Sequence, residues 1–480
     1  MPPIPDTKPP RRMLRRWVMA VASLAVLVAV FYAEEDWRGQ RAWKNCQHEF
    51  EAKGMVMDWN KYIPPLVPDD QNFFAAPKMQ EWFVKPNGMN SGSVDLPRRL
   101  QSTNQNLTGS VGSKTNLITT VAAAQNYLAW SDQFQPDFDL IRQALKRPYA
   151  RMAGDYTHPD EMPIPNFVTV RIVAQMLSQR THCYLLLNQP EQALKEITLV
   201  HDMCRLLEAA PTGKPMTLVS AMINVAVTGL YADVIAEGLR SGKWQESQLI
   251  ALQKQLAEIN LAPFMAGAFE NEPLGALQYF ETVEPRKLFA LSSVVTGSHQ
   301  KPSLWDRVRN LDTRLWDLLP RGWIYQNMAS YLKLSEAIRT SLLDADGFVT
   351  PKKCDRVMRE VETKLDHPNV FNLFSAIAIP NYSKAMQTFA FNQTKANEAQ
   401  IVCALEHYKI ANGNYPETLD ALVPQFIEKI PPDLIGGQPL DYRRKEDGKF
   451  LLYSIGWNET DDAGLPGTLA DVKKGDWVWP

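Results

Sequence analysis

Histidine is the side chain best suited to acid–base and metal chemistry near neutral pH, and this chain contains 7 of them. No two have the H-E-x-x-H spacing that sets metal ligands and a base on one helix face, and no G-x-S-x-G nucleophile elbow occurs. His201 and His407 stand beside apolar stripes of predicted helices, which favours core or rim positions. The sequence therefore predicts no catalytic residue, although catalytic groups can converge from distant positions. The histidines are His48, His158, His182, His201, His299, His367 and His407.

Cysteine can supply a nucleophile, a metal ligand or a disulfide, but the 5 cysteines are scattered and none forms a C-x-x-C pair. A disulfide between Cys183 and Cys204 would have to cross a predicted helical turn at residues 188–190. At about 1.5 Å per helical residue, Cys183 lies about 7 Å from that turn and Cys204 about 21 Å. The spacing therefore predicts buried free thiols at Cys46, Cys183, Cys204, Cys354 and Cys403.

Two further stretches contain residue types that occur in ligand sites. Residues 109–115 (GSVGSKT) resemble a phosphate-binding loop, but Ser113 separates the glycine from the lysine that must follow it directly. The surrounding segment, 87–116, has the Ser, Gly, Asn and Thr content of a solvated linker. Residues 146–151 (KRPYAR) hold two arginines that could form a site but are predicted as a structural pair, because ion pairs often imitate sites.

The charge balance limits the class of partner. The 51 Lys and Arg residues against 53 Asp and Glu residues give a net charge of −2, without the basic excess of nucleic-acid-binding proteins. No nucleic-acid partner is therefore expected. The 480 residues have room for two or three domains, and prolines outnumber glycines by 34 to 24, which indicates stiff connections.

An apolar segment near the start, Trp17–Ala33, is long enough to cross a bilayer as an untilted helix, for which about 17–25 residues are needed. Basic residues precede it and acidic residues follow it, which places residues 1–16 in the cytoplasm and the later chain outside. A cleaved signal peptide is the alternative, but the small-x-small cleavage pattern is missing before Ala33. The sequence predicts a single-pass anchor in the inner (cytoplasmic) membrane, with the body in the periplasm.

The rest of the chain is predicted to be mainly α. A helix should continue from the anchor to Lys53, and the prolines of residues 63–77 then predict a stiff arm with Phe73 and Phe74 buried. From 117 to 345 the apolar spacing is helical, and its most apolar part, 217–239, is predicted as a buried helix and not as a second span. The predicted layout is a cytoplasmic tail (1–16), a transmembrane anchor (17–33), an extended arm and linker (34–116), a helical body (117–380) and a small α+β module (381–480).

The C-terminal module has the clearest signals for individual elements. A long helix is expected from Asn381 to Ala411, where Asn412-Gly413 would end it in a left-handed conformation. A short helix is expected at 415–424. A hairpin should then pair 440–444 with 450–455 around Asp447-Gly448.

This order of elements, with the strings ALEHYKIANGNYPETLDALVP and LYSIGWNETDD, resembles the soluble domain of the type II secretion major pseudopilin. In that family an acidic loop after the hairpin binds calcium, and the resemblance maps that loop onto Asp461, Asp462 and Asp471. Calcium takes about six to eight oxygen ligands, more than two adjacent acids supply, so a solvated turn is the alternative. Ser375 stands where that family has a membrane-inserted glutamate, and the module is therefore expected to be a folded cap.

Residues 64–77 (PPLVPDDQNFFAAP) resemble a string in a group of uncharacterised single-pass bacterial envelope proteins with largely helical bodies. The features together predict a membrane-anchored envelope protein with a non-enzymatic role in protein binding or assembly. Its partners would be the membrane, through Trp17–Ala33, and another protein, and calcium is the one cofactor that a resemblance implies. Two alternatives stay open: an accessory component of a type II secretion-like system, and a membrane-tethered hydrolase with a site in the helical body.

Overall fold

The computed structural model describes residues 11–85, 96, 99, 118, 120–208, 216–283, 319–366, 369–379, 382–467, 471 and 473–480. Most of the predicted linker, the phosphate-loop-like residues 109–115, His299 and His367 lie outside these residues. The described chain is mainly helical, with an N-terminal apolar helix and a small antiparallel sheet, as predicted. It divides into two compact units, one from residues 1–57, 277–334 and 363–379 and the other from 58–276, 335–362 and 380–480. The five-part layout expected from the sequence stays a prediction.

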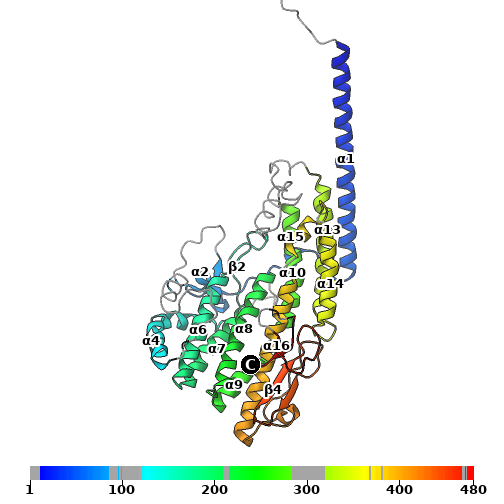
Figure 1. The fold of residues 1–480 in the computed structure, drawn as a ribbon. Helices are drawn as coiled ribbons and strands as arrows, with labels where there is room; N and C mark the ends of the chain where they lie inside the picture. Colours follow the sequence, from blue (N-terminus) through cyan, green and yellow to red (C-terminus); the bar gives the residue numbers. More distant parts are fainter. Residues whose placement is uncertain are drawn as a thin grey trace, which may run out of the picture. The chain divides into compact units, whose positions relative to one another are not determined.

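The first unit contains α1 (Arg11–Ala52), a single long helix (Figure 1). Its N-terminal half is apolar and exposed: the side chains of Trp17 and Leu27 are 69% and 67% exposed. Its C-terminal half instead buries Trp43 and Phe50. The predicted continuation of the helix beyond the apolar segment is therefore confirmed.

Two helices in the described part of the chain are long and apolar enough to cross a membrane. In α1 none of the apolar window is buried, so this helix could be a membrane anchor or a signal sequence. The other is α8 (Leu218–Arg240), where 72% of the window is buried inside the protein. Asn224, in the middle of α8, is fully buried and donates to the carboxylate of Glu208 (2.8 Å). The burial identifies α8 as a core helix, as predicted.

Two glycines allow α1 to approach the start of α13 (Arg321–Leu342) closely. A Cβ atom at Gly39 would overlap the backbone carbonyl of Gly322, so a side chain at this position needs the helices to separate. The backbone N–H of Gly322 donates to Asp36 Oδ1 (2.7 Å). The C-terminal half of α1 is thereby held against α13 by backbone contact and by a hydrogen bond.

Further contacts of the first unit join α13 to α15 (Leu373–Ala378). The buried Asn327 of α13 accepts a hydrogen bond from the backbone N–H of Phe374 (3.1 Å). The ring of Phe374 packs on that of Phe280, near the end of α10 (Leu261–Thr282), with centroids 4.4 Å apart. Phe280 also meets the ring of Tyr331 on α13, at 5.8 Å. Aromatic packing and the hydrogen bonds of Asn327 therefore help to hold this junction together.

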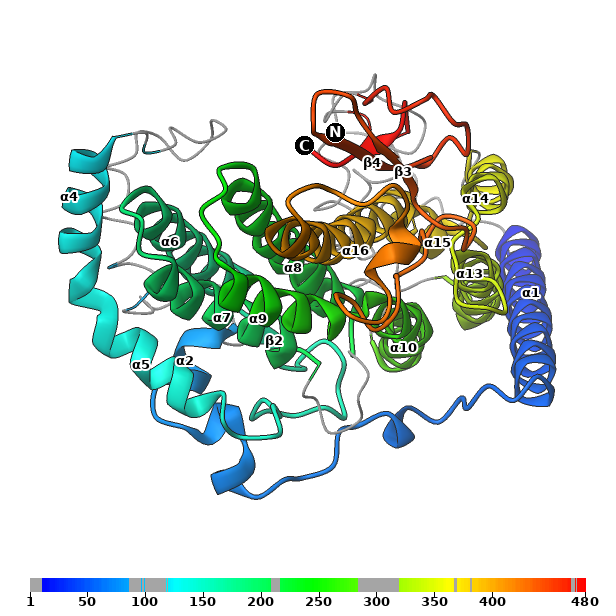
Figure 2. The same ribbon diagram turned by 90° about the horizontal axis from the view of Figure 1, so that it is seen from below.

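The second unit contains a layer of packed helices. α6 (Phe167–Leu186) and α7 (Pro190–Leu206) form a hairpin, α7 packs against α8, and α16 (Tyr382–Asn412) packs against both α8 and α9 (Glu246–Ala257), as Figure 2 shows. Asn188, with φ at 56°, makes the turn between α6 and α7, and Pro190 begins α7. The predicted pair of helices and the break between them are confirmed.

The predicted apolar stripes lie in the core of this unit. Ala193, Ile197 and Val200 of α7 are fully buried, and so is Leu252 of α9. All five cysteines lie in the described part of the chain, where they are buried and free, as predicted. Burial raises the pKa of the Cys204 thiol to about 12, so this thiol stays protonated and unreactive at neutral pH.

Residues 146–166 are not helical, and here the helical run predicted from 117 to 345 is wrong. The prolines in this segment remove backbone donors and favour extended conformations, which ends the helical structure that precedes them. Two residues of the segment form β2 (Ile164–Pro165), which pairs antiparallel with β1 (Val84–Lys85). The elements before it are α4 (Val121–Ser131), η4 (Asp132–Phe134) and α5 (Gln135–Ala144).

The proline-rich arm belongs to the second unit, and its two phenylalanines are buried as predicted. Phe73 and Phe74 are 1% and 5% exposed, and their rings pack edge to face with centroids 5.1 Å apart. Trp59, also buried, donates through Nε1 to the backbone carbonyl of Tyr156 (2.8 Å). The arm contains η2 (Asp69–Gln71) and η3 (Phe73–Ala75); η1 (Trp59–Lys61) precedes it and α2 (Met79–Phe83) follows it.

The C-terminal elements follow the predicted order. α16 ends at Asn412, and Gly413 has the left-handed φ of 81°. β3 (Asp441–Arg444) and β4 (Phe450–Ser454) form the predicted hairpin, and β5 (Trp477–Val478) adds a third antiparallel strand beside β4. The short helix predicted at 415–424 is reduced to the 3-10 turn η6 (Leu419–Leu422). α14 (Pro351–Leu365) precedes this module, and its Asp355 accepts from Trp457 Nε1 (3.1 Å).

Candidate functional site

The acidic loop of the C-terminal module forms hydrogen bonds within the module. Asp461 Oδ1 accepts from the Tyr453 hydroxyl (3.0 Å) and from the backbone N–H of Ala463 (2.8 Å). The two carboxylate oxygens of Asp476 accept from the backbone N–H groups of Asp462 (3.1 Å) and Gly464 (2.7 Å). Asp476 therefore stabilises the loop by accepting from two of its backbone N–H groups.

Asp471 has a different environment. It forms an ion pair with Lys474 (3.2 Å) and accepts from the backbone N–H of Lys473 (3.1 Å), and these hydrogen bonds lower the pKa of its carboxyl group. Among the residues that the structure describes, no three His, Cys, Asp or Glu side chains gather closely enough to hold a metal ion. As arranged, the loop falls short of the oxygen ligands that calcium takes. Calcium binding by Asp461, Asp462 and Asp471 stays a prediction.

The histidines near the helical core have separate partners. His182 forms an ion pair with Glu237 (2.5 Å) and a hydrogen bond with the carbonyl of Ile118 (2.7 Å). His201 is 2% exposed and lies 3.3 Å from Asp202, whereas His407 lies 3.1 Å from Glu246 on α9. These three histidines do not form a cluster within the described residues, and each occupies a core or rim position.

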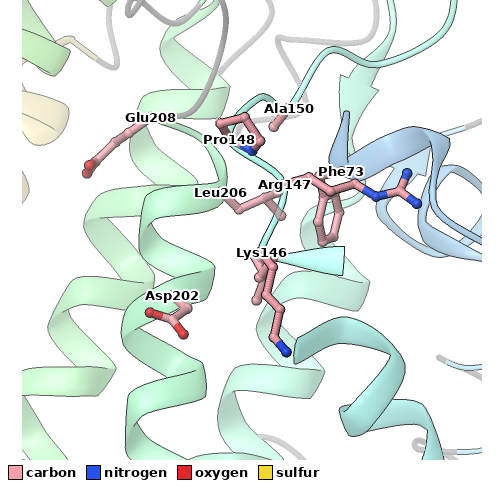
Figure 3. Close-up of a pocket in the computed structure, with 9 residues that line it drawn as sticks. Phe73, Lys146, Arg147, Pro148, Ala150, Asp202, Leu206 and Glu208 are labelled. Atoms are coloured by element: carbon pink, nitrogen blue, oxygen red, sulfur yellow. The ribbon is translucent and has the colours of Figure 1, made fainter. Parts of the chain in front are cut away.

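A cavity of about 610 Å³ lies in the second unit and gathers charged groups of both signs (Figure 3). Asp202 comes from α7 and Glu208 from the chain just beyond it, whereas the opposite wall is the non-helical segment after α5. The ring of Phe73 comes from the arm. The lining residues are Phe73, Leu145, Lys146, Arg147, Pro148, Ala150, Asp202, Leu206 and Glu208.

The arm holds the segment 146–150 in place. Arg147 Nη1 donates to the backbone carbonyls of Asp69 (2.8 Å) and Asn72 (2.9 Å). The backbone N–H of Phe73 donates to the carbonyl of Tyr149 (2.7 Å). Since Pro148 prevents helical continuation of α5, these bonds replace the helical ones that the segment lacks. The wall of the cavity thus depends on the docked arm.

The charged side chains that line the cavity differ in the hydrogen bonds that hold them. The Arg147 guanidinium turns away from the acids toward the arm, whereas the Lys146 side chain points in a different direction (Figure 3). Lys146 is exposed, and no hydrogen bond or ion pair joins its Nζ to another residue of the described chain. Asp202 is 41% exposed at its side chain, and Glu208 accepts from Asn224 (2.8 Å). The cavity therefore has a basic wall and an acidic wall.

A smaller apolar cavity of about 40 Å³ shares Ala150 and Leu206 with the larger one. Three methionines contribute to its lining, namely Met152, Met162 and Met216. Methionine side chains are flexible and polarizable and adapt to apolar groups of different shape. The two cavities together provide a charged compartment with an apolar side compartment.

The sequence identified only part of this site. It singled out residues 146–151 and predicted a structural role for the arginines, which agrees with the bonds that Arg147 and Arg151 make to the arm. It did not identify Asp202 and Glu208, because single acids beside an apolar helical stripe are ordinary surface residues. Their approach to Lys146 depends on the tertiary fold.

Comparison with models of known protein families, with characterised proteins and with solved structures gives no match to this chain.

Proposed function

We propose that this protein is a single-pass, membrane-anchored envelope protein that binds another protein in the cavity between α7 and residues 145–150. The cavity carries the proposal, because its volume falls in the range of about 300–1,000 Å³ typical of ligand pockets and its charged groups are placed on opposite walls. The role is non-enzymatic. The apolar half of α1 is the membrane anchor, with residues 1–16 in the cytoplasm and the helical units outside.

Membrane attachment is tested by alkaline carbonate extraction of membranes that contain the full chain. The protein should stay in the membrane pellet, because an apolar helix of this length is retained by the bilayer. Recovery of the protein in the soluble fraction, with its first residue beyond Ala33, would show a cleaved signal peptide.

Partner binding is tested by site-specific photo-crosslinking of the full chain in its native membrane. A photoreactive phenylalanine analogue replaces Leu145 in the cavity, and a matched control carries it at Ile250, an exposed residue of α9. We expect a discrete protein adduct from position 145, and its loss when Asp202→Asn and Glu208→Gln are added. Equal adducts from both positions, or none from position 145, would contradict the proposal.

A membrane-tethered hydrolase is the second candidate. One observation favours it: the carboxylates of Asp202 and Glu208 line the cavity, and His201 lies beside Asp202. Because the His201 side chain is 2% exposed, it would act on a substrate in the cavity through its contact with Asp202 and not by touching the substrate. Turnover of ester or peptide substrates by the purified full chain, abolished by His201→Gln, would favour this candidate over binding alone.

A further inference from the structure

The cations of the two cavities lie on one side. Arg147 and Arg151 donate to backbone carbonyls of the arm, with Arg151 Nε 3.0 Å from the carbonyl oxygen of Pro64. These bonds fix their charges in place. Lys146 also lines the cavity and is exposed, and its side chain points in a different direction from that of Arg147 (Figure 3). Residues 146–151 can therefore receive an anionic group through Lys146, and the same segment carries the fixed positive charges of Arg147 and Arg151.

The anions lie on the other side. Asp202 and Glu208 also line the cavity; they come from α7 and from the chain just beyond it, a different element from the segment that carries Lys146 (Figure 3). A ligand of one sign would meet like charges on one wall, and like charges repel at close range. The arrangement therefore favours a ligand that carries an anion and a cation.

From these placements we infer that the cavity recognises a short peptide that carries both a positive and a negative charge and a small apolar side chain. This inference rests on the proposed function and names the ligand that the same site takes. The cation lies against Asp202 and Glu208, the anion against Lys146, and the apolar side chain enters the cavity lined by methionines. The charges belong either to the ends of a free peptide or to side chains within a partner protein.

The test is isothermal titration of the full chain in detergent with forms of the tripeptide Ala-Val-Ala. The peptide with free ends carries a terminal ammonium and a terminal carboxylate group. N-acetylation leaves only the carboxylate charge, and C-amidation leaves only the ammonium charge. The peptide with both changes is uncharged. We expect the free form to bind at least about 10-fold more tightly than each capped form. Tightest binding by a singly charged or uncharged form would overturn the inference.

Variants of the two walls separate the charge contributions. Asp202→Asn with Glu208→Gln removes the acidic side chains that recognise the peptide cation, so the free and N-acetylated forms should bind this variant equally. Lys146→Met removes the cation that recognises the peptide anion, so the free and C-amidated forms should bind that variant equally. Glu208→Gln keeps a carbonyl that accepts from Asn224, which preserves the local fold. Asp447→Asn and Lys449→Met, in the exposed hairpin turn, are the matched controls and should change no affinity.

The doubly capped peptide acetyl-Lys-Val-Glu-amide distinguishes the two sources of charge. Binding of this peptide supports an internal segment of a partner protein, and binding of free-ended Ala-Val-Ala alone supports a free peptide. A protein adduct from position 145 without any charge preference would overturn the ligand class and leave the proposed function standing. Charge-dependent peptide binding without a protein adduct would sustain the ligand class and overturn the protein-binding role.

Discussion

Arg180 shows how a buried charge is balanced in the second unit. Its side chain is 1% exposed and forms ion pairs with Glu196 (3.1 Å) and Asp132 (2.9 Å), while Nη1 also donates to the hydroxyl of Ser131 (2.6 Å). Glu196 is 3% exposed, so this pair lies in the helical core. Such a pair stabilises the fold only while both partners are present.

Replacement of Arg180 by methionine should therefore strongly destabilise the second unit. The change leaves the buried Glu196 with Arg142 (2.8 Å) as its remaining arginine partner, and we expect the free energy of unfolding to fall by about 3 kcal/mol, the lower end of the cost of breaking a buried ion pair. Denaturant unfolding of the full chain, followed by circular dichroism, measures it. The exposed Arg240→Met variant is the control. Similar midpoints for the two variants would contradict the role of this ion pair.

Two neighbouring buried acids make stability depend on pH. Burial raises the pKa of the Asp433 carboxyl to about 6, and burial together with the nearby Asp433 raises the pKa of Glu398 well above its usual value. Lys395 opposes the shift at Glu398. The folded state therefore holds these protons more tightly than the unfolded state, and the stabilisation is lost as pH rises through the folded pKa values.

We expect the free energy of unfolding to fall as pH rises from about 4 through 6 and beyond. Glu398→Gln removes one titrating group, so the free energy of unfolding of the variant should fall less steeply with rising pH. At about pH 8 it should be higher than that of the parent protein. Denaturant midpoints across this range measure the effect. Glu362→Gln, an exposed residue of α14, should follow the parent curve. If the denaturant midpoint of Glu398→Gln changed with pH in parallel with that of the parent protein, Glu398 would not contribute to the pH dependence.

The contact between α1 and α13 depends on a glycine at the crossing point. Gly39→Val would place a side chain where the backbone of Gly322 lies, and overpacking of this kind costs about 1–3 kcal/mol. We expect faster protease cleavage after Ala52 in membrane-embedded protein, since α1 would separate from α13. Gln40→Val, at the next residue of α1, where the side chain is exposed, is the matched control. Equal cleavage of both variants would count against the glycine contact.

The elements that were predicted correctly have local signals. Asn412-Gly413 and residues 188–190 end helices because their backbone conformations are incompatible with a continued helix, and these signals lie within a few residues of the elements they end. β5 had no such signal, because its pairing with β4 joins segments far apart in the chain. Residues 146–166 were predicted wrongly because helical spacing was extended across several prolines.

The organisation of the whole molecule was beyond local sequence signals. Each of the two units combines three segments that are far apart in the chain, and α10, α13 and α14 each contain residues of both. The apolar helix and the mainly helical composition were predictable from spacing alone. The cavity was not, because its walls come from the arm, from the chain after α5 and from α7.

The arm and the cavity are coupled through adjacent residues. Arg147 donates to two backbone carbonyls of the arm, and its neighbour Lys146 lines the cavity. Cutting the chain within residues 63–72 should therefore loosen this wall of the cavity and weaken the binding that we propose, while α1 and the hairpin of α6 and α7 remain whole.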